Sequence, residues 1–255
     1  MSVIATTLNG INVLQQGADF SRVVAAGVDV IHFDISSGKA LPPGPFGEFM
    51  IANIASWTNL CIDVHLLDDA SSVRIENSVA CGADILTIPL EIISKSVRQL
   101  VSDLGALLCA EVKISRASIT QLPSRMDLVY LDLDEGAKSS SSFPSTFENS
   151  YLDAIHAMRR GAPDVAVAGR LPTLTISPFI IKLLQSLDLV TLDLFETDNP
   201  TAVIEEVRHY MSPDLHPTLH RALPHGLNIK RDQRRLVSIF ETLEAKMPPK
   251  TSKFM

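Results

Sequence analysis

Short apolar runs alternate with helical patterns along most of this chain. Runs rich in β-branched residues predict eight strands, at Val3–Thr7, Val28–Asp34, Leu60–His65, Ile85–Ile88, Leu107–Ile114, Leu128–Asp132, Val165–Ala168 and Leu187–Leu192. Apolar residues at helical spacing predict helices between them, at Phe20–Ala26, Phe49–Ser56, Val73–Ala80, Ser94–Leu104, Tyr151–Arg160, Ser177–Gln185 and Pro200–Met211. Four helices are followed by a glycine expected to end them, Gly27, Gly82, Gly105 and Gly161. This alternation predicts an α/β fold, a closed (β/α)8 TIM barrel, with a doubly wound open sheet as the alternative.

The barrel pattern ends at the helix Pro200–Met211. We therefore expect residues 1–211 to form the barrel and residues 212–255 to form a C-terminal helical extension, which is basic, with eight Lys and Arg against four Asp and Glu. The extension opens with a segment rich in Pro and His, and a helix is predicted from about Ile229 to Met247. One face of that helix carries four apolar residues, Leu236, Phe240, Leu243 and Met247. This face should pack on the barrel or on a second subunit, so a homo-oligomer is expected.

Composition narrows the classes of partner. The net charge is −7, which argues against a protein that binds nucleic acid over its whole surface. No stretch of about 18 uninterrupted apolar residues suggests a membrane segment, and the N-terminus does not resemble a signal peptide. Cys61, Cys81 and Cys109 match neither a zinc-ribbon spacing nor a disulfide framework. A cytoplasmic protein with buried thiols is the expectation.

Two predicted strands end in imidazole and carboxylate groups. His32 and Asp34 are two residues apart, as are Asp63 and His65, so each pair lies on one face of its strand. A single histidine at a strand end is more often a hydrogen-bonded rim residue than a ligand. In a parallel barrel, however, these ends converge, so His32, Asp34 and His65 could meet around one divalent metal ion. Such ligands suit Zn, Fe, Mn or Co, and their spacing does not distinguish among these metals.

The chain resembles the ribulose-phosphate 3-epimerase family over about residues 4 to 211. The similarity is densest from Ala25 to Leu90, where it includes Ala-Ala-Gly-Val-Asp-Val-Ile-His-Phe-Asp-Ile, Asp-Val-His-Leu at 63–66 and Gly-Ala-Asp-Ile at 82–85. The resemblance implies a (β/α)8 barrel and a small carbohydrate substrate. It also implies a divalent metal held by His32, Asp34 and His65, with epimerisation through an enediolate.

The sequence departs from the family pattern after the seventh strand. The family has Asp-Gly-Gly there, and its Asp is both the fourth metal ligand and the second proton-transfer group; this chain has Ala168 instead. Asp34 would remain as the acid and base. Asp193, at the end of strand eight, could take over the vacant catalytic role, and Asp132 and Asp134 are competing donors. All three could equally be ordinary strand-end aspartates.

This chain also differs from the family pattern at the positions where the resemblance implies contacts with phosphate. The family's Met-Asp-Gly aspartate is replaced by Ser37, a serine after strand one by Gly10, and the glycine-rich loop after strand six by Ala137 to Ser141. The resemblance therefore places the substrate at Gly10, Ser37, Gly169, Arg170, Ser139 and Ser140. A carboxylate at Asp193 would repel phosphate where the family has Gly-Ser.

Two hypotheses follow. The first is a diverged metal-dependent epimerase or isomerase acting on a sugar or sugar phosphate, with Asp34 as acid and base. The second is a barrel that has lost catalysis and serves as a binding or assembly module. Under either, ribulose 5-phosphate should be a poor substrate, since losing a general acid or base costs about a hundredfold or more in rate.

Overall fold

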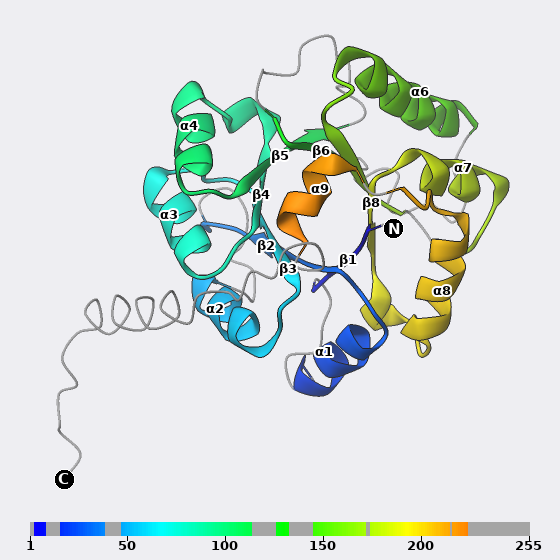
Figure 1. Ribbon diagram of the computed structural model, residues 1–255, viewed down its shortest axis with the longest axis horizontal. Coiled ribbons are helices and arrows are strands. Elements are labelled where there is room, and N and C mark those ends of the chain that lie inside the picture. Colours follow the sequence, from blue (N-terminus) through cyan, green and yellow to red (C-terminus); the bar gives the residue numbers. More distant parts are fainter. Residues whose placement is uncertain are drawn as a thin grey trace.

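The computed structural model describes residues 3–8, 16–38, 47–113, 126–132, 145–171, 174–214 and 216–223. Eight parallel strands pair in the order of the sequence and close into a barrel, which excludes the open sheet (Figure 1). The strands are β1 (Val3–Thr7), β2 (Val30–Ile35), β3 (Cys61–Leu66), β4 (Ile85–Pro89), β5 (Leu107–Lys113), β6 (Leu128–Asp132), β7 (Ala166–Arg170) and β8 (Leu189–Leu192). All eight predicted strands are confirmed.

Helices surround the barrel as an outer ring (Figure 1). They are α1 (Gln16–Ala25), α2 (Glu48–Trp57), α3 (Ser72–Ala80), α4 (Lys95–Asp103), α6 (Ser145–Gly161), α7 (Pro178–Ser186) and α8 (Pro200–Tyr210), with short 3-10 turns η1 (Leu90–Ile92) and η3 (Leu194–Glu196). Gly27, Gly82 and Gly105 have positive φ angles just after α1, α3 and α4, as predicted. Gly161 was predicted to follow its helix and is instead the last residue of α6.

The barrel interior changes from apolar to polar along the strands. Alternate side chains of a strand face the interior. The first residue of each strand belongs to one buried cluster, made of Val3, Val30, Cys61, Ile85, Leu107, Leu128, Ala166 and Leu189 together with later strand residues. Farther along the strands the buried side chains include His32, Asp63, His65, Thr87 and Glu111. The polar groups therefore gather toward the carboxyl ends of the strands.

A further helix, α9 (Pro217–Ala222), closes the opposite end of the barrel. Leu219 and Leu223 belong to the same cluster as the first strand residues, and Arg221 pairs with Asp127 at the start of β6, at 2.6 Å. The segment rich in Pro and His thus contains a helix that forms the floor of the barrel (Figure 1). The predicted helix Ile229–Met247 lies outside the described residues.

Four aspartates at the strand starts join the strands in pairs. Asp29, Asp84, Asp127 and Asp188 precede β2, β4, β6 and β8. Each carboxylate accepts a hydrogen bond from a backbone N–H of the preceding strand, at 2.7–3.0 Å, and each aspartate N–H donates to the carbonyl of that same strand residue. The residues bound in this way are Ile4, Ile62, Leu108 and Val167. We call this set the aspartate belt.

Two other expectations concern membranes and thiols. Within the described part of the chain, no helix has the length and apolar character needed to cross a membrane. The three cysteines are free and buried. Burial, with a smaller contribution from Glu48, raises the pKa of Cys81 to about 11, which keeps this thiol protonated at neutral pH.

Candidate metal and active site

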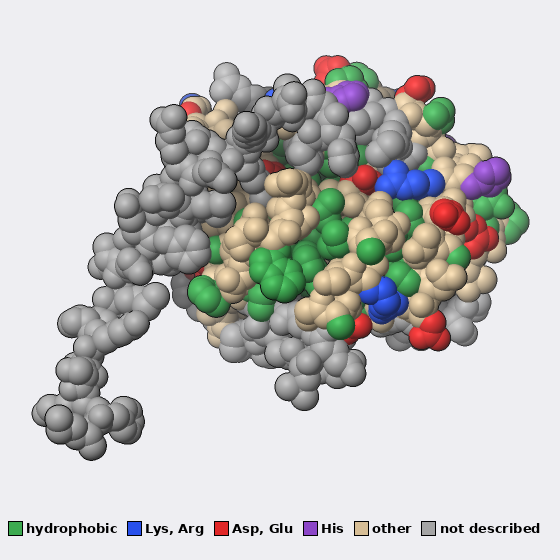
Figure 2. Space-filling model, turned by 60° about the horizontal axis from the view of Figure 1, so that its bottom comes forward, with side chains coloured by type: hydrophobic (Ala, Val, Ile, Leu, Met, Phe, Trp, Pro, Cys, Tyr) green, Lys and Arg blue, Asp and Glu red, His purple; other side chains and the backbone are tan. Residues whose placement is uncertain are grey.

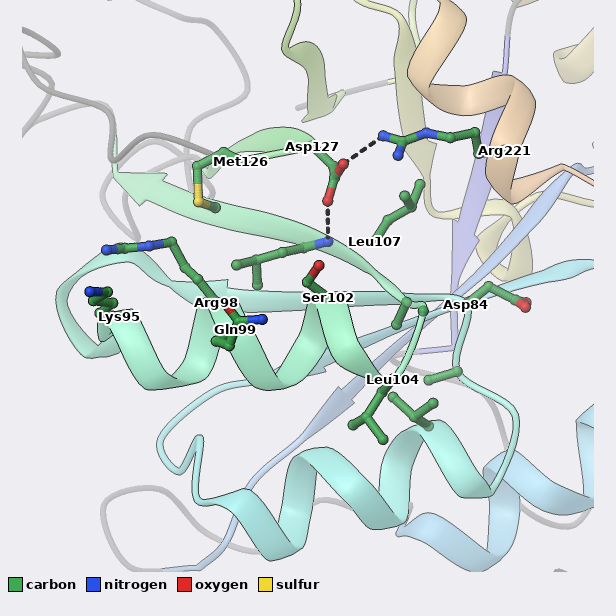
Figure 3. A pocket seen from close by; sticks show the side chains of 15 residues that line it. Asp84, Lys95, Arg98, Gln99, Ser102, Leu104, Leu107, Met126, Asp127 and Arg221 are labelled. Atoms are coloured by element: carbon green, nitrogen blue, oxygen red, sulfur yellow. Dashed lines mark hydrogen bonds and ion pairs between the residues drawn. The ribbon is translucent and has the colours of Figure 1, made fainter.

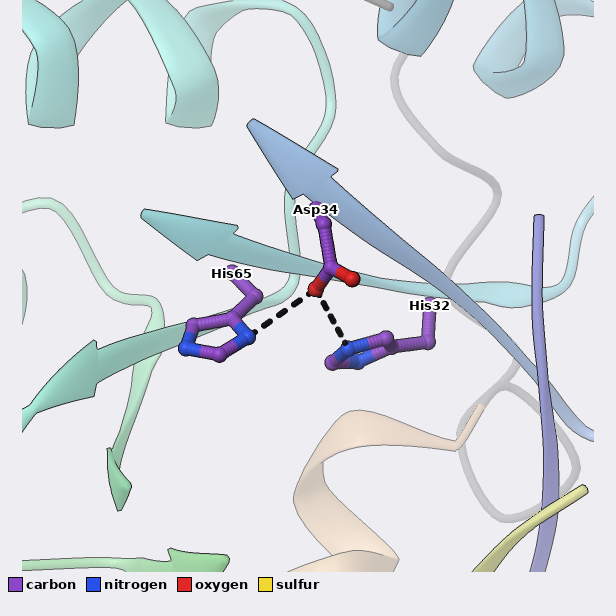
Figure 4. Close-up of side chains that lie close together, drawn as sticks. All are labelled: His32, Asp34 and His65. Carbon is purple, nitrogen blue, oxygen red and sulfur yellow. Dashed lines mark hydrogen bonds and ion pairs between the residues drawn. The ribbon is translucent and has the colours of Figure 1, made fainter. Parts of the chain in front are cut away.

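The carboxyl ends of β2 and β3 bring His32, Asp34 and His65 together. The two strands pair with His32 beside Asp63 and Asp34 beside His65, so all four side chains point into the barrel. One potential ligand atom from each of His32, Asp34 and His65 lies within 4.8 Å of the other two (Figure 4). No other group of this kind occurs among the residues that the structure describes. The structure thus brings together the three residues proposed as metal ligands.

Every ring nitrogen of the two histidines faces a carboxylate. His32 contacts Asp63 through Nδ1, at 2.8 Å, and Asp34 through Nε2, at 3.1 Å. His65 contacts the same Asp34 oxygen through Nδ1, at 3.0 Å, and Glu111 through Nε2, at 3.2 Å. A carboxylate accepts hydrogen bonds and, when ionised, donates none. Each imidazole is therefore doubly protonated in the metal-free protein.

The electrostatics agree with that assignment. Burial alone would lower the pKa of His32, but the charges and hydrogen bonds of Asp63 and Asp34 outweigh it and raise the pKa to about 10. Burial opposes the same change at His65, where Asp34 and Glu111 raise the pKa to about 9. Burial would raise the pKa of Asp34, yet its hydrogen bonds to the two histidines hold that pKa well below its usual range.

Three further polar residues complete this cluster, and none was predicted as a site residue. Thr87 donates to the second oxygen of Asp63, at 2.7 Å. Glu111 of β5 is only 8% exposed. Tyr130 of β6 stacks on His32 with ring centroids 5.6 Å apart and planes 9° apart. The sequence does show each of these residues as a polar residue inside an apolar strand. It does not show that the side chain faces the barrel interior, because that depends on the strand register.

The end of β7 differs from what the resemblance implies for the family. Ala168 is buried and pairs with Tyr130, so no carboxylate occupies this position. Arg170 donates to Asp193 at 2.5 Å, which ties the end of β7 to the residue after β8. Burial would lower the pKa of Arg170, but Asp193 raises it, with a smaller contribution from Asp34. Asp193 therefore has a cationic partner, and its catalytic role remains a prediction.

The remaining predicted substrate residues have different surroundings. Ser37 donates to Asp68 through its backbone N–H, at 2.7 Å, and through its hydroxyl, at 3.0 Å. Gly169 faces α6, where an added Cβ would lie 2.6 Å from the Tyr151 hydroxyl oxygen. Three more positions, together with Asp134, lie outside the described residues: Gly10, Ser139 and Ser140.

A pocket of about 880 Å³ lies away from this cluster. Its lining includes Lys95 and Arg98 of α4, Leu107 at the start of β5 and Asp127 before β6 (Figure 3). Asp127 already binds the N–H of Leu108 and the side chain of Arg221. The pocket thus lies toward the amino ends of the strands, whereas the histidine cluster lies toward their carboxyl ends, where barrel enzymes have their active sites.

A sequence profile of the Ribulose-phosphate 3 epimerase family matches residues 3–162. The chain belongs to this family. Ribulose-phosphate 3-epimerase of Chlamydia pneumoniae is 28% identical over 163 residues, which cover 62% of this chain and 70% of that enzyme. The chloroplastic enzyme of Arabidopsis thaliana is 27% identical over 89 residues, but this match spans only 35% of this chain and 32% of the relative. The profile of the epimerase family ends just before β7, the strand that carries Ala168 and Arg170.

Solved structures support the barrel fold alone. A Yersinia pestis dihydropteroate synthase is 12% identical to this chain and aligns with a TM-score of 0.53. The alignment covers 82% of this chain and 94% of the synthase chain. A protein cage designed by fusing symmetric oligomeric domains is 14% identical, with coverage of 96% of this chain and 81% of that chain and a TM-score of 0.57. Identity this low carries no argument about the reaction, so the epimerase family assignment rests on the sequence profile.

Proposed function

We propose that this chain is a metal-dependent epimerase or isomerase that acts on a sugar or sugar phosphate through an enediolate. The observation that carries the proposal is the convergence of His32, Asp34 and His65 within 4.8 Å at the carboxyl end of the barrel. Two imidazole nitrogens and a carboxylate oxygen are a donor set that fits Zn, Fe, Mn or Co. Membership of the epimerase family supports the same class of reaction.

Four residues would have distinct roles in the proposed reaction. His32, Asp34 and His65 would hold the ion, which would supply positive charge to stabilise the enediolate when bound. Asp34 would move the proton at the substrate carbon, because its carboxylate is 23% exposed while both histidine side chains are nearly buried. Stacked Tyr130 would keep the His32 ring in place.

The proton on the opposite face of the carbon has no obvious donor. Ala168 supplies none, and Asp193 is paired with Arg170. Asp193 remains our candidate for the second catalytic group, and it would have to leave this ion pair to act. We therefore propose that proton exchange at one face of the carbon survives better than full inversion.

The alternative is a barrel that binds or assembles without catalysis. The Arg170–Asp193 pair favours it, because the two charges neutralise each other where the family pattern has a glycine after strand seven and Gly-Ser after strand eight. Ser37 likewise satisfies both its donors on Asp68. Under this hypothesis the histidine cluster would serve only as a buried ionic network.

Deuterium exchange separates the two hypotheses better than turnover. The purified protein is supplied with Co²⁺ or Mn²⁺, and ribulose 5-phosphate in D₂O is followed by proton NMR. We expect deuterium to enter the substrate faster than the epimer forms, with epimerisation at least about a hundredfold slower than for ordinary family members. Asp34→Asn should abolish exchange, and Glu76→Gln, a change at an exposed position on α3, should not alter it.

The possible results differ clearly. Metal binding with exchange that depends on Asp34 supports the epimerase class. Ordinary epimerase turnover would instead show that Ala168 has been fully compensated. A protein that binds no metal and exchanges no proton would leave the binding module as the better description.

A further inference from the structure

Glu111 is a buried carboxylate whose position the proposed reaction does not yet explain. It lies on β5, two strands from His65, and only 8% of the residue is exposed. An ionised carboxylate in such a place needs a compensating partner. Its Oε2 atom lies 3.2 Å from Nε2 of His65, and this contact supplies the partner.

The contact falls on one particular nitrogen of His65. Nδ1 of the ring faces Asp34, in the space between the three candidate ligands, and Nε2 points away toward Glu111. A neutral imidazole has one N–H and one lone pair. A carboxylate at Nε2 keeps the N–H on that side, so the lone pair is left at Nδ1, where the ion would bind.

His32 has the same arrangement with the nitrogens exchanged. Its Nε2 faces Asp34, and its Nδ1 lies 2.8 Å from Asp63, which is itself fixed by the hydroxyl of Thr87. Metal-binding histidines usually donate their other N–H to a carboxylate or carbonyl, and this partner sets the ring orientation. Both histidines of the cluster thus have a buried carboxylate behind them.

We propose that Glu111 is a positioning residue for the metal site, which holds His65 as an Nδ1 ligand through the Nε2–H···Oε2 hydrogen bond. This inference rests on the proposed metal-dependent function and adds a residue from a third strand to it. The role depends on reach as well as charge. An aspartate at this position would be shorter by about one carbon–carbon bond, roughly 1.5 Å, and its carboxylate would be too far from His65.

Two variants of Glu111 test the length of the side chain and its charge separately. Glu111→Gln keeps the length and can still accept from Nε2–H through its amide oxygen, whereas Glu111→Asp keeps the charge and loses the length. We expect Glu111→Asp and Glu111→Ala to weaken Co²⁺ binding by about ten- to a hundredfold, the usual effect of losing such a partner. Glu111→Gln should retain more of the affinity than Glu111→Asp, and Glu76→Gln should match the wild type.

Two measurements on the full-length protein test this. Chelator competition gives the Co²⁺ affinity of each variant, with circular dichroism to confirm that it folds. In the Zn²⁺-loaded wild type, long-range proton–nitrogen NMR should place the remaining His65 proton on Nε2, and this reading involves no substrate.

The outcomes distinguish this proposal from the epimerase hypothesis. Unchanged Co²⁺ affinity in folded Glu111→Ala and Glu111→Asp, or a His65 proton on Nδ1, would overturn the role of Glu111 and leave the metal site standing. Normal metal binding without any proton exchange on the sugar phosphate would overturn the proposed reaction and leave Glu111 in its role. A wild type that binds no metal would overturn both.

Discussion

The histidine cluster is a chain of alternating charges. Asp63, His32, Asp34, His65 and Glu111 follow one another through contacts of 2.8–3.2 Å. Two of the three carboxylates, Asp63 and Glu111, are buried and call for positive charge nearby. Two protonated imidazoles supply it in the metal-free protein, and a divalent ion with two neutral imidazoles supplies the same charge. Metal binding should therefore be an exchange of one ion for two protons.

This exchange predicts a strong pH dependence. The pKa values of about 10 for His32 and about 9 for His65 mean that both rings are protonated at neutral pH. Because binding releases two protons, the apparent association constant should rise by roughly a hundredfold per pH unit between pH 7 and 8.5. Titration calorimetry in buffers with different ionisation enthalpies should count close to two protons per ion. An affinity that does not change with pH would contradict the assignment of both imidazoles.

The metal-free protein should respond to pH in the opposite direction. Both pKa values are raised above the unfolded value, so the stabilisation they contribute is complete below about pH 6.5. It is lost as the pH rises through about 9 and 10. The melting temperature of the metal-free protein should fall over this range, and that of the Zn²⁺-loaded protein should fall less. Equal losses in both forms would indicate that other groups are responsible.

Sequence reasoning found some residues of this cluster and missed others for a physical reason. His32, Asp34 and His65 were predictable because two-residue spacing places His32 with Asp34 on one face of β2, and His65 with Asp63 on one face of β3. Glu111 was not, because nothing in Leu-Leu-Cys-Ala-Glu-Val-Lys indicates which alternate set faces inward. That direction is fixed only when β5 pairs with β4 and β6. The pairing of Arg170 with Asp193 has the same origin, because it depends on the register of β7 with β8.

The observed bounds of several strands and helices are close to the predicted ones. Strand β6 has the predicted bounds, and α2, α3 and α7 differ from prediction by one residue at one end or both. Helix α6 begins at Ser145, six residues before the predicted Tyr151. Helix α9, which begins at Pro217, was not predicted. Proline is tolerated at the first position of a helix, and the His216 ring accepts from the N–H of Thr218.

The turn between α3 and β4 offers a test at this scale. Gly82 has a φ of +115°, and an added Cβ would lie 2.7 Å from the Cβ of Ala55 in α2, whereas Gly105 has a φ of +75° and open space around it. Gly105→Ala should cost about 1 kcal/mol through backbone strain alone. Gly82→Ala adds a steric overlap, and we expect a loss of about 2–3 kcal/mol. Urea unfolding measures both. Equal losses would mean that α2 moves away at little cost.

The molecule as a whole exposes several large apolar side chains. Phe49, Trp57 and Val73 are 67%, 72% and 60% exposed, on the neighbouring helices α2 and α3. Figure 2 shows hydrophobic side chains gathered near the middle of one face. Large exposed apolar groups are typical of interaction surfaces. Phe49, Trp57 and Val73 could therefore contribute to the expected contact between subunits.

Light scattering tests this expectation on the intact chain. We expect a mass of at least two copies of the 27.8 kDa chain. Deleting residues 226–255 should reduce the number of copies per particle if the extension forms the interface, and Trp57→Ser should reduce it if α2 does. An intact chain that is a monomer in solution would refute the expectation, and an unchanged number of copies after the deletion would exclude the extension.

The aspartate belt stabilises one end of the barrel, and the proposed active site lies at the other end. Its carboxylates act at the strand starts, and the floor helix α9 attaches to the same end through Arg221 and Asp127. The mouth at the other end takes no part in these bonds. Neither Ala168 nor Arg170 forms one of these bonds. Substitutions at the carboxyl ends of the strands could therefore change the substrate, or remove the catalytic activity, without breaking the bonds that stabilise the barrel.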